Sequence, residues 1–381
     1  MRSQLKRKGS RTLAPLKELC VDDSMFVPPE QLMPGKKIGA GAFATVELCG
    51  YTDRAGKSRP VAVKRLKPEL LEQEGELNKF VEEAKLLRTI RHEYITEFIG
   101  LGGDRRGTGM YIVQEYMNGG TIKSLVMRQM GEPFKRLYSF EGAFEWLIQI
   151  AEGLAHLHEL GVVHRDLKLE NVLLTVSDPS EGKVAKLADF GLSVLTKQPG
   201  GATTRHAADA EGGTPPKLAT FSKMPTFSTK KQPALKRVSS KVLAKDTVDA
   251  KYELTGRTGS LMYMAPEVFR CEKYNEKVDV FSFAIIMYEL LRKSVLLVFV
   301  ATTGSPEDVE RHAENIVNGM RPPMPQEWPD ELADLIRECW HQNPDKRPAM
   351  KDVIPRLRRL KDAGVLQEPA RNASAGCCSV Q

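Results

Sequence analysis

The sequence predicts an α+β fold in which strands come first along the chain and helices dominate the remainder. Strand-like segments, with a glycine-rich turn or alternating apolar residues, lie at 38–46, 61–64 and 111–117. A helix-like segment with apolar residues at a helical period follows at 140–160, and a segment that is apolar nearly all round, as a buried helix would be, at 279–291. At 381 residues the chain is longer than one average domain, so we expect two compact units.

The composition is that of a globular protein with a full core. Hydrophobic residues make up 41% of the chain and charged residues 28%, as in soluble globular proteins. No apolar run approaches the roughly 18 residues that a spanning helix needs, and the N-terminal residues lack the apolar core of a signal peptide. The six cysteines are scattered without metal-ligand spacing, so we expect free thiols in a reducing, cytoplasmic compartment.

The net charge of +7 has a local origin. From Thr196 to Arg257 the chain contains twelve Lys or Arg and five Asp or Glu, so this segment alone carries the excess. The remainder is close to neutral, although the first twenty residues are basic. This pattern describes a charged surface segment, and we expect no nucleic-acid partner for the folded body.

A short central segment concentrates chemically active groups. Asp166 lies two residues before Lys168 and five before Asn171, and Asp189 follows after a strand-like stretch. An Asp near a hydroxyl can accept its proton, and the Lys can reach a transferring phosphate. Asn171 and Asp189 offer the hard oxygen ligands that magnesium prefers. The full run H-R-D-L-K-L-E-N, followed by D-F-G, resembles the catalytic loop and metal-binding triplet of protein kinases.

The resemblance covers about residues 36–360, apart from one inserted segment. It implies a two-lobed protein-kinase-like fold, with a β-rich small lobe at 34–117 and a mainly helical large lobe at 118–360. ATP and Mg²⁺ would bind between the lobes as cofactors. We expect a basic flexible leader at 1–33 and a C-terminal tail at 361–381.

A glycine-rich turn and an alternating strand precede the catalytic segment at the family's spacing. Gly39 and Gly41 lie between two strand-like segments, and glycine lets backbone amides approach phosphate oxygens. Ala44 replaces the third glycine of the family's pattern. Lys64 ends the strand V-A-V-K and resembles the lysine that pairs with the α and β phosphates.

The partner of Lys64 can be predicted from helix geometry. Within residues 78–91 the apolar side chains share one face at helical period, and Glu83 falls inside that face. Glu82 instead lies beside Lys85 on the solvent side. Because an unpaired buried carboxylate is costly, Glu83 is our candidate for an ion pair with Lys64. The alternative is a solvated glutamate at the edge of the helix.

The strand at 111–117 runs into glycines and resembles the family's hinge between the lobes. The resemblance implies that Glu115 and Met117 offer backbone groups to the adenine, and that Gln114 partly closes the pocket behind it. Four apolar side chains would enclose the adenine: Ile38, Val46, Ala62 and Leu173.

The stretch between Asp189 and the A-P-E triplet at 265–267 is longer than in the compact family pattern. Residues 197–250 are rich in Gly, Pro, Ser, Thr and Lys and have few large apolar groups, so we expect a disordered insertion. It is either a neutral surface insertion or a regulatory segment that is phosphorylated or docks a partner.

The end of this stretch carries candidate phosphosites. Thr258 is the first candidate, with Thr255 and Ser260 behind it, and an upstream kinase or autophosphorylation would modify them. Arg165, next to Asp166, would receive the phosphate. Ser260 also falls where the family's serine/threonine kinases carry a hydroxyl that touches the catalytic Asp and Lys.

Two further predictions concern the framework of the large lobe. Asp279 begins an almost wholly apolar helical segment, so we expect it to cap that helix and to brace the catalytic loop backbone. By resemblance, Arg347 would pair with Glu267 in a structural bond.

The chain ends in C-S-V-Q, which resembles a farnesylation box with Cys378 as the lipid site and Cys377 as a second one. Ser379 fits the aliphatic position of the box poorly. The alternative is a tail whose two adjacent cysteines carry no lipid. If Cys378 is modified, the cytoplasmic protein would contact a membrane peripherally.

Residues typical of two kinase classes occur together. Lys168 and Ser260 favour serine/threonine acceptors, whereas F-V-E-E-A at 80–84 and Cys339-Trp340 resemble tyrosine kinases. The mixture is similar to the tyrosine-kinase-like group, which includes Raf-like serine/threonine kinases. The resemblance implies an ATP-dependent serine/threonine kinase that acts on protein substrates in intracellular signalling.

Two alternatives remain open. One is a pseudokinase that acts as a scaffold or nucleotide sensor, for which only Ala44 and the long insertion argue. The other is a kinase with tyrosine activity as well.

Overall fold

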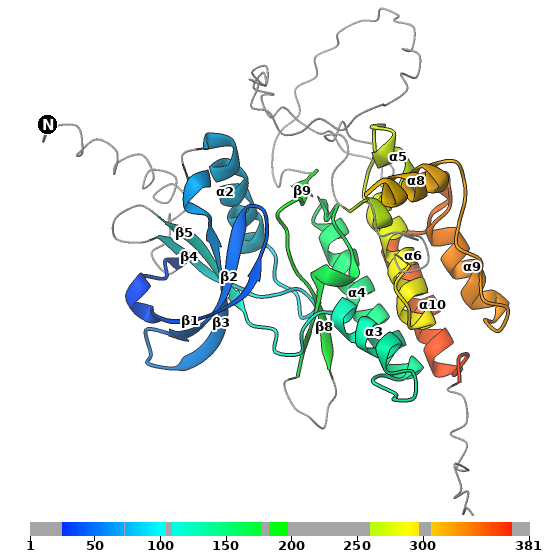
Figure 1. Cartoon of the computed structure of the whole chain (residues 1–381), viewed down its shortest axis with the longest axis horizontal. Coiled ribbons are helices and arrows are strands. Elements are labelled where there is room, and N and C mark those ends of the chain that lie inside the picture. Colours follow the sequence, from blue (N-terminus) through cyan, green and yellow to red (C-terminus); the bar gives the residue numbers. More distant parts are fainter. Residues whose placement is uncertain are drawn as a thin grey trace, which may run out of the picture. The chain divides into compact units, whose positions relative to one another are not determined.

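The N-terminal part of the chain is mainly strands and the C-terminal part mainly helices, as the α+β prediction requires, although one helix interrupts the first strands and short strands recur among the helices (Figure 1). The computed structural model describes residues 25–71, 73–103, 109–176, 183–196, 260–296 and 306–367. These residues belong to one compact unit. The candidates Thr255, Thr258, Cys377 and Cys378 and the predicted insertion at 197–250 lie outside the described residues.

An antiparallel sheet of five strands occupies the N-terminal part, in the order β1-β2-β3-β5-β4. Its strands are β1 (Leu32–Ala40), β2 (Ala44–Thr52), β3 (Ser58–Leu66), β4 (Phe98–Gly103) and β5 (Met110–Glu115). The glycine-rich turn joins β1 and β2, and the N–H of Gly41 donates to the Ala44 carbonyl at 2.9 Å. Successive side chains of β3 point to opposite faces of the sheet. Val61 and Val63 are fully buried on one face, whereas Ala62 and Lys64 lie on the other, partly open face.

The buried face of β3 belongs to a small apolar cluster. Its members are Val27, Leu32, Cys49, Val61, Val63, Tyr111 and Val113. Two of these residues, Val27 and Leu32, come from the stretch that the sequence assigned to the leader. Phe26 forms a parallel bridge with Leu101 of β4, so the described end of the leader, from residue 25 onward, packs on the sheet.

Helix α2 (Glu74–Thr89) is the predicted helix at 78–91, begun four residues earlier and ended two residues earlier. Phe80, Ala84 and Leu87 are buried, as the apolar stripe predicted, and Glu83 is buried with them. Glu82 is exposed and pairs with Lys85.

The C-terminal part is mainly helical. Its helices are α3 (Ile122–Gly131), α4 (Phe140–Glu159), α5 (Pro266–Phe269), α6 (Lys277–Arg292), α8 (Pro306–Val317), α9 (Asp330–Cys339) and α10 (Met350–Asp362). Side-chain caps explain two of the starts, because Thr121 accepts from the Ser124 N–H and Ser139 from the Gly142 N–H, each at 3.0 Å. Helix α6 is buried from Lys277 to Leu291. The sequence predicted such a helix, apolar nearly all round, for a large core.

Helix α10 packs on α4. Leu357 and Leu360 are fully buried, and Arg358 and Lys361 form ion pairs with Glu152 and Glu145 of α4. The catalytic loop follows α4, so α10 supports the helix that leads into the site.

Two short antiparallel ladders position the catalytic segment. They pair β6 (Val162–Val163) with β9 (Val194–Leu195), and β7 (Val172–Thr175) with β8 (Val184–Leu187). The 3₁₀ turns are η2 (Pro29–Gln31), η3 (Pro68–Leu70), η4 (Leu169–Asn171), η5 (Leu261–Tyr263) and η6 (Pro344–Lys346). Within the described residues, no helix combines the length and apolar character that crossing a bilayer requires.

Candidate active site

The backbone of the catalytic loop is held by one buried carboxylate. Asp279 of α6 is fully buried and accepts the N–H groups of His164 at 2.8 Å and Arg165 at 2.9 Å. Its Oδ2 also lies 3.0 Å from Nε2 of His158. Burial alone would raise the pKa of Asp279, but the hydrogen bonds and charges of these histidines hold it below its usual value. The predicted bracing role of Asp279 is confirmed.

The predicted capping role of Asp279 is wrong. Helix α6 begins at Lys277 and its N-cap residue is Glu276. Asp279 therefore lies inside the first turn, where its side chain is turned to the catalytic loop. A side chain inside the helix and directed to the loop is not in the N-cap position, and α6 has no side-chain cap hydrogen bond.

Arg165 has φ 66°, the left-handed region that is uncommon for a residue with a side chain. Its N–H is fixed by Asp279, and its guanidinium donates to the Leu192 carbonyl and, at 3.4 Å, to the Tyr274 hydroxyl. This conformation reverses the chain between His164 and Asp166. The strain is held in place by bonds at both ends of the residue.

Both carboxylate oxygens of Asp166 accept hydrogen bonds. Nζ of Lys168 lies 2.6 Å and Nδ2 of Asn171 3.0 Å from its Oδ2. The N–H of Ser260 donates to Oδ1 at 3.1 Å. Ser260 thus reaches Asp166 through its backbone, whereas the sequence suggested its hydroxyl. These contacts fix the orientation of the Asp166 carboxylate.

The predicted ion pair between Lys64 and Glu83 is present. Nζ of Lys64 lies 2.6 Å from Oε1 of Glu83 and 3.1 Å from Oδ1 of Asp189. Burial would lower the pKa of Lys64, but these two carboxylates outweigh it and raise that pKa. Lys64 is therefore a cation that joins β3, helix α2 and the segment after β8.

Asp189 follows β8 and also has a left-handed φ, of 60°. Although burial opposes it, the charge of Lys64 lowers the pKa of Asp189. Next to it, Phe190 is buried against the ring of His164, with centroids 5.1 Å apart. Nε2 of His164 lies 3.2 Å from the Ala188 carbonyl oxygen. The catalytic loop and the acidic triplet are thus fixed to each other.

The residues present fit a magnesium ion shared with a phosphate. Among the described residues, no group of three or more His, Cys, Asp or Glu forms a self-contained metal site. The side-chain NH₂ of Asn171 donates to Asp166, which leaves its oxygen as the atom that could face a cation. One amide oxygen and the Asp189 carboxylate are too few ligands alone, but magnesium commonly takes the remainder from phosphates and water.

The glycine-rich turn leaves room that the protein itself does not use. A Cβ added to Gly39 would meet no atom closer than 3.6 Å, and one added to Gly41 none closer than 3.9 Å. At Gly102, by contrast, an added Cβ would collide with the Val27 carbonyl oxygen at 2.3 Å. Packing therefore requires glycine at 102 but not at 39 or 41, where the open backbone suits a bound phosphate.

The apolar side chains predicted to enclose the adenine are partly open to solvent. Val46, Ala62 and Leu173 are half-buried, and Ile38 is exposed. The neighbours of Ala62 and Leu173 on their strands are fully buried, whereas those of Val46 are half-buried like Val46 itself. Val46 pairs with Lys64 and Leu48 with Ala62 across β2 and β3, so Val46, Ala62 and Lys64 share one face of the sheet.

The predicted hinge residues follow at the end of β5. Nε2 of Gln114 donates to Oγ1 of Thr96 at 3.4 Å, so its side chain is directed toward the loop before β4. The Glu115 N–H donates to the Glu97 carbonyl at 3.0 Å. The backbone N–H of Glu115 is therefore already used, and only its carbonyl group remains for the predicted contact with the adenine. Met117 is buried.

The predicted pair of Arg347 with Glu267 is confirmed as a framework bond. NH1 and NH2 of Arg347 donate to the two carboxylate oxygens at 2.6 and 2.9 Å. The same guanidinium donates to the carbonyls of Lys277 and His341. Both side chains are buried, and the guanidinium nitrogens of Arg347 all donate to these framework acceptors instead of to the catalytic site.

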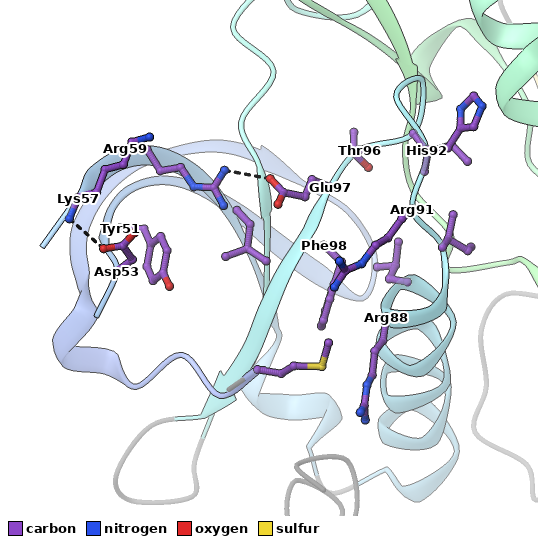
Figure 2. A pocket seen from close by; sticks show the side chains of 15 residues that line it. Tyr51, Asp53, Lys57, Arg59, Arg88, Arg91, His92, Thr96, Glu97 and Phe98 are labelled. Carbon is purple, nitrogen blue, oxygen red and sulfur yellow. Dashed lines mark hydrogen bonds and ion pairs between the residues drawn. The ribbon is translucent and has the colours of Figure 1, made fainter. Parts of the chain in front are cut away.

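A cavity of about 590 Å³ lies in the small lobe, between the C-terminal end of α2 and strand β4 (Figure 2). Arg88, Arg91, Thr96 and Glu97 are among its lining residues. None of the residues predicted to bind nucleotide or to catalyse lines it. The cavity is thus separate from the site that the motifs define.

Sequence reasoning missed two polar contacts near the site. Nζ of Lys186 on β8 lies 2.9 Å from both carboxylate oxygens of Glu115. The Tyr263 hydroxyl donates to the buried Glu289 at 2.6 Å. The alternation of β8, in which Lys186 stands between apolar residues, was the available signal for the first contact. Glu289 inside an apolar helix was the signal for the second.

The arrangement of these groups is the one expected of the catalytic site in two-lobed protein kinases. The family model of protein tyrosine and serine/threonine kinases matches residues 32–211 and 231–357. The chain belongs to this family and is a eukaryotic protein kinase of the tyrosine-kinase-like type.

Named relatives agree with that assignment. The serine/threonine-protein kinase VIK of Arabidopsis thaliana is 30% identical over 329 residues, which cover 85% of this chain and 59% of that protein. The Arabidopsis serine/threonine-protein kinase STY46 is 26% identical over 369 residues, covering 97% and 51%. The tyrosine-protein kinase JAK1 of Danio rerio is 28% identical over 365 residues, covering 93% and 26%. The chain spans about half the length of the first two relatives.

Proposed function

We propose that this protein transfers the γ-phosphate of ATP to serine or threonine hydroxyls of protein substrates. The observation that carries the proposal is the simultaneous contact of Lys64 with Glu83 and Asp189. The lysine proposed to position the phosphates is thus in contact with its helix partner and with the carboxylate proposed to hold magnesium. This arrangement supports phosphotransfer, and the transfer assay below distinguishes it from a pseudokinase that only binds nucleotide.

The catalytic residues divide the reaction between them. The substrate hydroxyl oxygen attacks the γ-phosphorus of ATP. The bond between the γ-phosphorus and the β–γ bridging oxygen breaks, and ADP leaves. Asp166 accepts the hydroxyl proton, since its carboxylate is held by Lys168 and by Ser260. Lys168, 2.6 Å from Asp166, stabilises negative charge on the transferred group.

The remaining groups bind and orient ATP. Lys64 holds the α and β phosphates, while Glu83 fixes the direction of its ammonium group. Asn171 and Asp189 would hold magnesium, which neutralises phosphate charge when bound. Ile38, Val46, Ala62 and Leu173 enclose the adenine, and the backbone at Glu115 and Met117 reads its edge.

The choice of serine and threonine acceptors rests on Lys168 and on the names of the plant relatives. The zebrafish relative is named a tyrosine-protein kinase, so tyrosine transfer is the second candidate. Phosphoamino-acid analysis of the product separates the two.

The first test compares wild type with Asp166→Asn in transfer from Mg-ATP to a generic protein substrate. We expect wild-type transfer to serine or threonine and a loss of about 1,000-fold or more in the variant, because the proton acceptor is gone. Asp334→Asn, in an exposed pair with Arg337 on α9, is the matched control and should keep full activity. A wild type that binds ATP but transfers no phosphate would establish the scaffold reading instead.

We also propose a lipid on Cys378 and, with it, peripheral membrane contact of a cytoplasmic protein. The C-terminal C-S-V-Q pattern supports it. The intact mass of protein purified from its native cell tests the idea. A mass that equals the unmodified sequence contradicts it.

A further inference from the structure

The inference concerns Lys186 and Glu115, which none of the predicted roles uses as side chains. Nζ of Lys186 lies 2.9 Å from each carboxylate oxygen of Glu115. The two side chains are only 16% and 23% exposed, so solvent screens their attraction weakly. One ammonium nitrogen contacts both carboxylate oxygens, so the contact places Nζ of Lys186 centrally on the Glu115 carboxylate.

Each partner lies next to a segment that positions the site. Glu115 is the last residue of β5, just before the connection between the lobes. Lys186 lies on β8, three residues before Asp189, and its cross-strand partner is Leu173 of the predicted adenine pocket. The pair thus joins the end of the small-lobe sheet to the strand that delivers Asp189.

The contacts around the site form a closed ring. Glu115 is opposite Val61 in the ladder of β5 and β3, and Lys64 lies three residues along β3. Lys64 reaches Asp189 at 3.1 Å, and β8 leads back to Lys186. The Lys186–Glu115 contact completes this ring and so helps to fix the distance between Lys64 and Asp189, in addition to the pairing of β8 with β7.

The loop before β4 supports the same junction. The Glu97 N–H donates to Oε2 of Glu115 at 3.2 Å, and the Thr96 N–H donates to the Leu187 carbonyl at 3.0 Å. Glu97 in turn pairs with Arg59 of β3 at 2.9 Å (Figure 2). Both ion-pair partners therefore have little freedom to find other positions.

We propose that Lys186 is a positioning residue, which through Glu115 sets the place of Asp189 relative to Lys64 and so the metal-dependent affinity for ATP. The proposal rests on the proposed kinase function. It does not require Lys186 to touch the nucleotide. Its effect appears where Asp189 acts, on the metal and the phosphates, and not on adenine binding alone.

The test measures binding of a fluorescent ATP analogue with and without Mg²⁺. In Lys186→Met we expect Kd with Mg²⁺ to rise about tenfold, a change of the size that coupled pairs show, and Kd without Mg²⁺ to stay unchanged. In the transfer assay KM for Mg-ATP should rise in parallel, with kcat reduced less. Lys85→Met, which removes an exposed ion pair of α2, is the matched control.

Rescue variants separate positioning from general loosening of the fold. Lys186→Arg keeps the positive charge and should bind Mg-ATP nearly as wild type does. The exchange Glu115→Lys with Lys186→Glu should restore most of the affinity that either single change removes. Thermal unfolding of all variants shows whether each one is folded.

Three outcomes would overturn the proposal. The first is a folded Lys186→Met protein with wild-type affinity for Mg-ATP. The second is tighter binding, which would make the pair a restraint on the site. The third is equal weakening with and without Mg²⁺. Because binding is measured without phosphotransfer, these results are distinguishable from a wild type that binds ATP and lacks kinase activity.

Discussion

Two buried glutamates, Glu83 and Glu267, each meet a basic side chain, and the surroundings of the two pairs differ. Arg347 and Glu267 have side chains 0% and 3% exposed, and the guanidinium also donates to two carbonyls. Lys64 and Glu83 are 19% and 5% exposed, and Lys64 also reaches Asp189. An ammonium group has three donors, so Lys64 retains capacity for a phosphate.

The difference separates a framework bond from a working one. The Arg347 pair is bidentate, closed and far less adaptable, because its geometry is fixed by the planar fork. In the other pair, Lys64 contributes a compact ammonium charge on the partly open face of β3. Both pairs join a glutamate to a cation, so chemical type alone does not distinguish them. They differ in that Lys64 is still partly exposed and keeps one unused N–H donor, whereas Arg347 is fully buried.

The largest expected effect comes from breaking the framework bond. Arg347→Met leaves Glu267 buried without a cation, so the free energy of unfolding should fall by about 3–5 kcal/mol. Denaturant titration measures it. Arg337→Met, in an exposed pair on α9, should cost about 0.5 kcal/mol or less. Equal costs for the two variants would refute the comparison.

Breaking the working bond should mainly affect catalysis. Lys64→Met should lower kcat about 100- to 1,000-fold, because a positioned charge on the phosphates is lost. Stability should fall by at most about 2 kcal/mol, since the partly exposed position of Lys64 lets water reach the Glu83 carboxylate once Lys64 is gone. Transfer assays and unfolding curves on the same preparation test both halves. A variant that keeps its activity, or that loses stability as Arg347→Met does, would contradict the distinction.

A third buried glutamate, Glu289, sharpens the comparison, because among the residues that the structure describes no cation lies within hydrogen-bonding reach of its carboxylate. Glu289 accepts from the Tyr263 hydroxyl at 2.6 Å and the Leu296 N–H at 2.8 Å. Burial raises its pKa from 4.5 to about 7. Between these two values the folded state keeps a proton that the unfolded state has released. The stability contribution is therefore full below pH 4.5 and is lost as the pH rises through about 7.

Replacing Glu289 removes this titration. Relative to Glu289→Gln, wild type should lose roughly 1 to 3 kcal/mol of unfolding free energy between about pH 5 and about pH 8. Urea titrations of both proteins across that range provide the measurement. Parallel pH profiles for wild type and the variant would show that the carboxyl does not titrate in this window.

The sequence predicted the parts of the fold and site that depend on local pattern. The stripe Phe80, Ala84 and Leu87 identified the buried face of α2, and from it the Lys64–Glu83 pair followed. The alternation of β3 separated Val61 and Val63 from Lys64. These predictions succeeded because a buried charge has few acceptable partners, and periodicity shows which charges are buried.

What could not be predicted depends on contacts between distant segments. Asp279 was expected both to cap its helix and to brace the catalytic loop, and only the packing of α6 under that loop shows that its carboxylate does the second and not the first. The contact of Lys186 with Glu115 joins residues 71 positions apart. The packing of Val27 and Leu32 on the sheet depends on a cluster assembled from several strands. The roles of Asp166, Lys168, Asn171 and Asp189 in catalysis stay predictions that the assays above test.

The way α10 rests on α4 sets a practical limit on how far the chain can be shortened. Leu357 and Leu360 fill the space beside α4, and Arg358 and Lys361 reach across to Glu152 and Glu145. Val365 and Leu366 also pack on the core, so a protease that cuts after Gln367 should leave the folded core intact. A cut before Leu357 would expose an apolar strip and release the helix that carries the catalytic loop. Gene truncations for crystallisation should keep α10 whole.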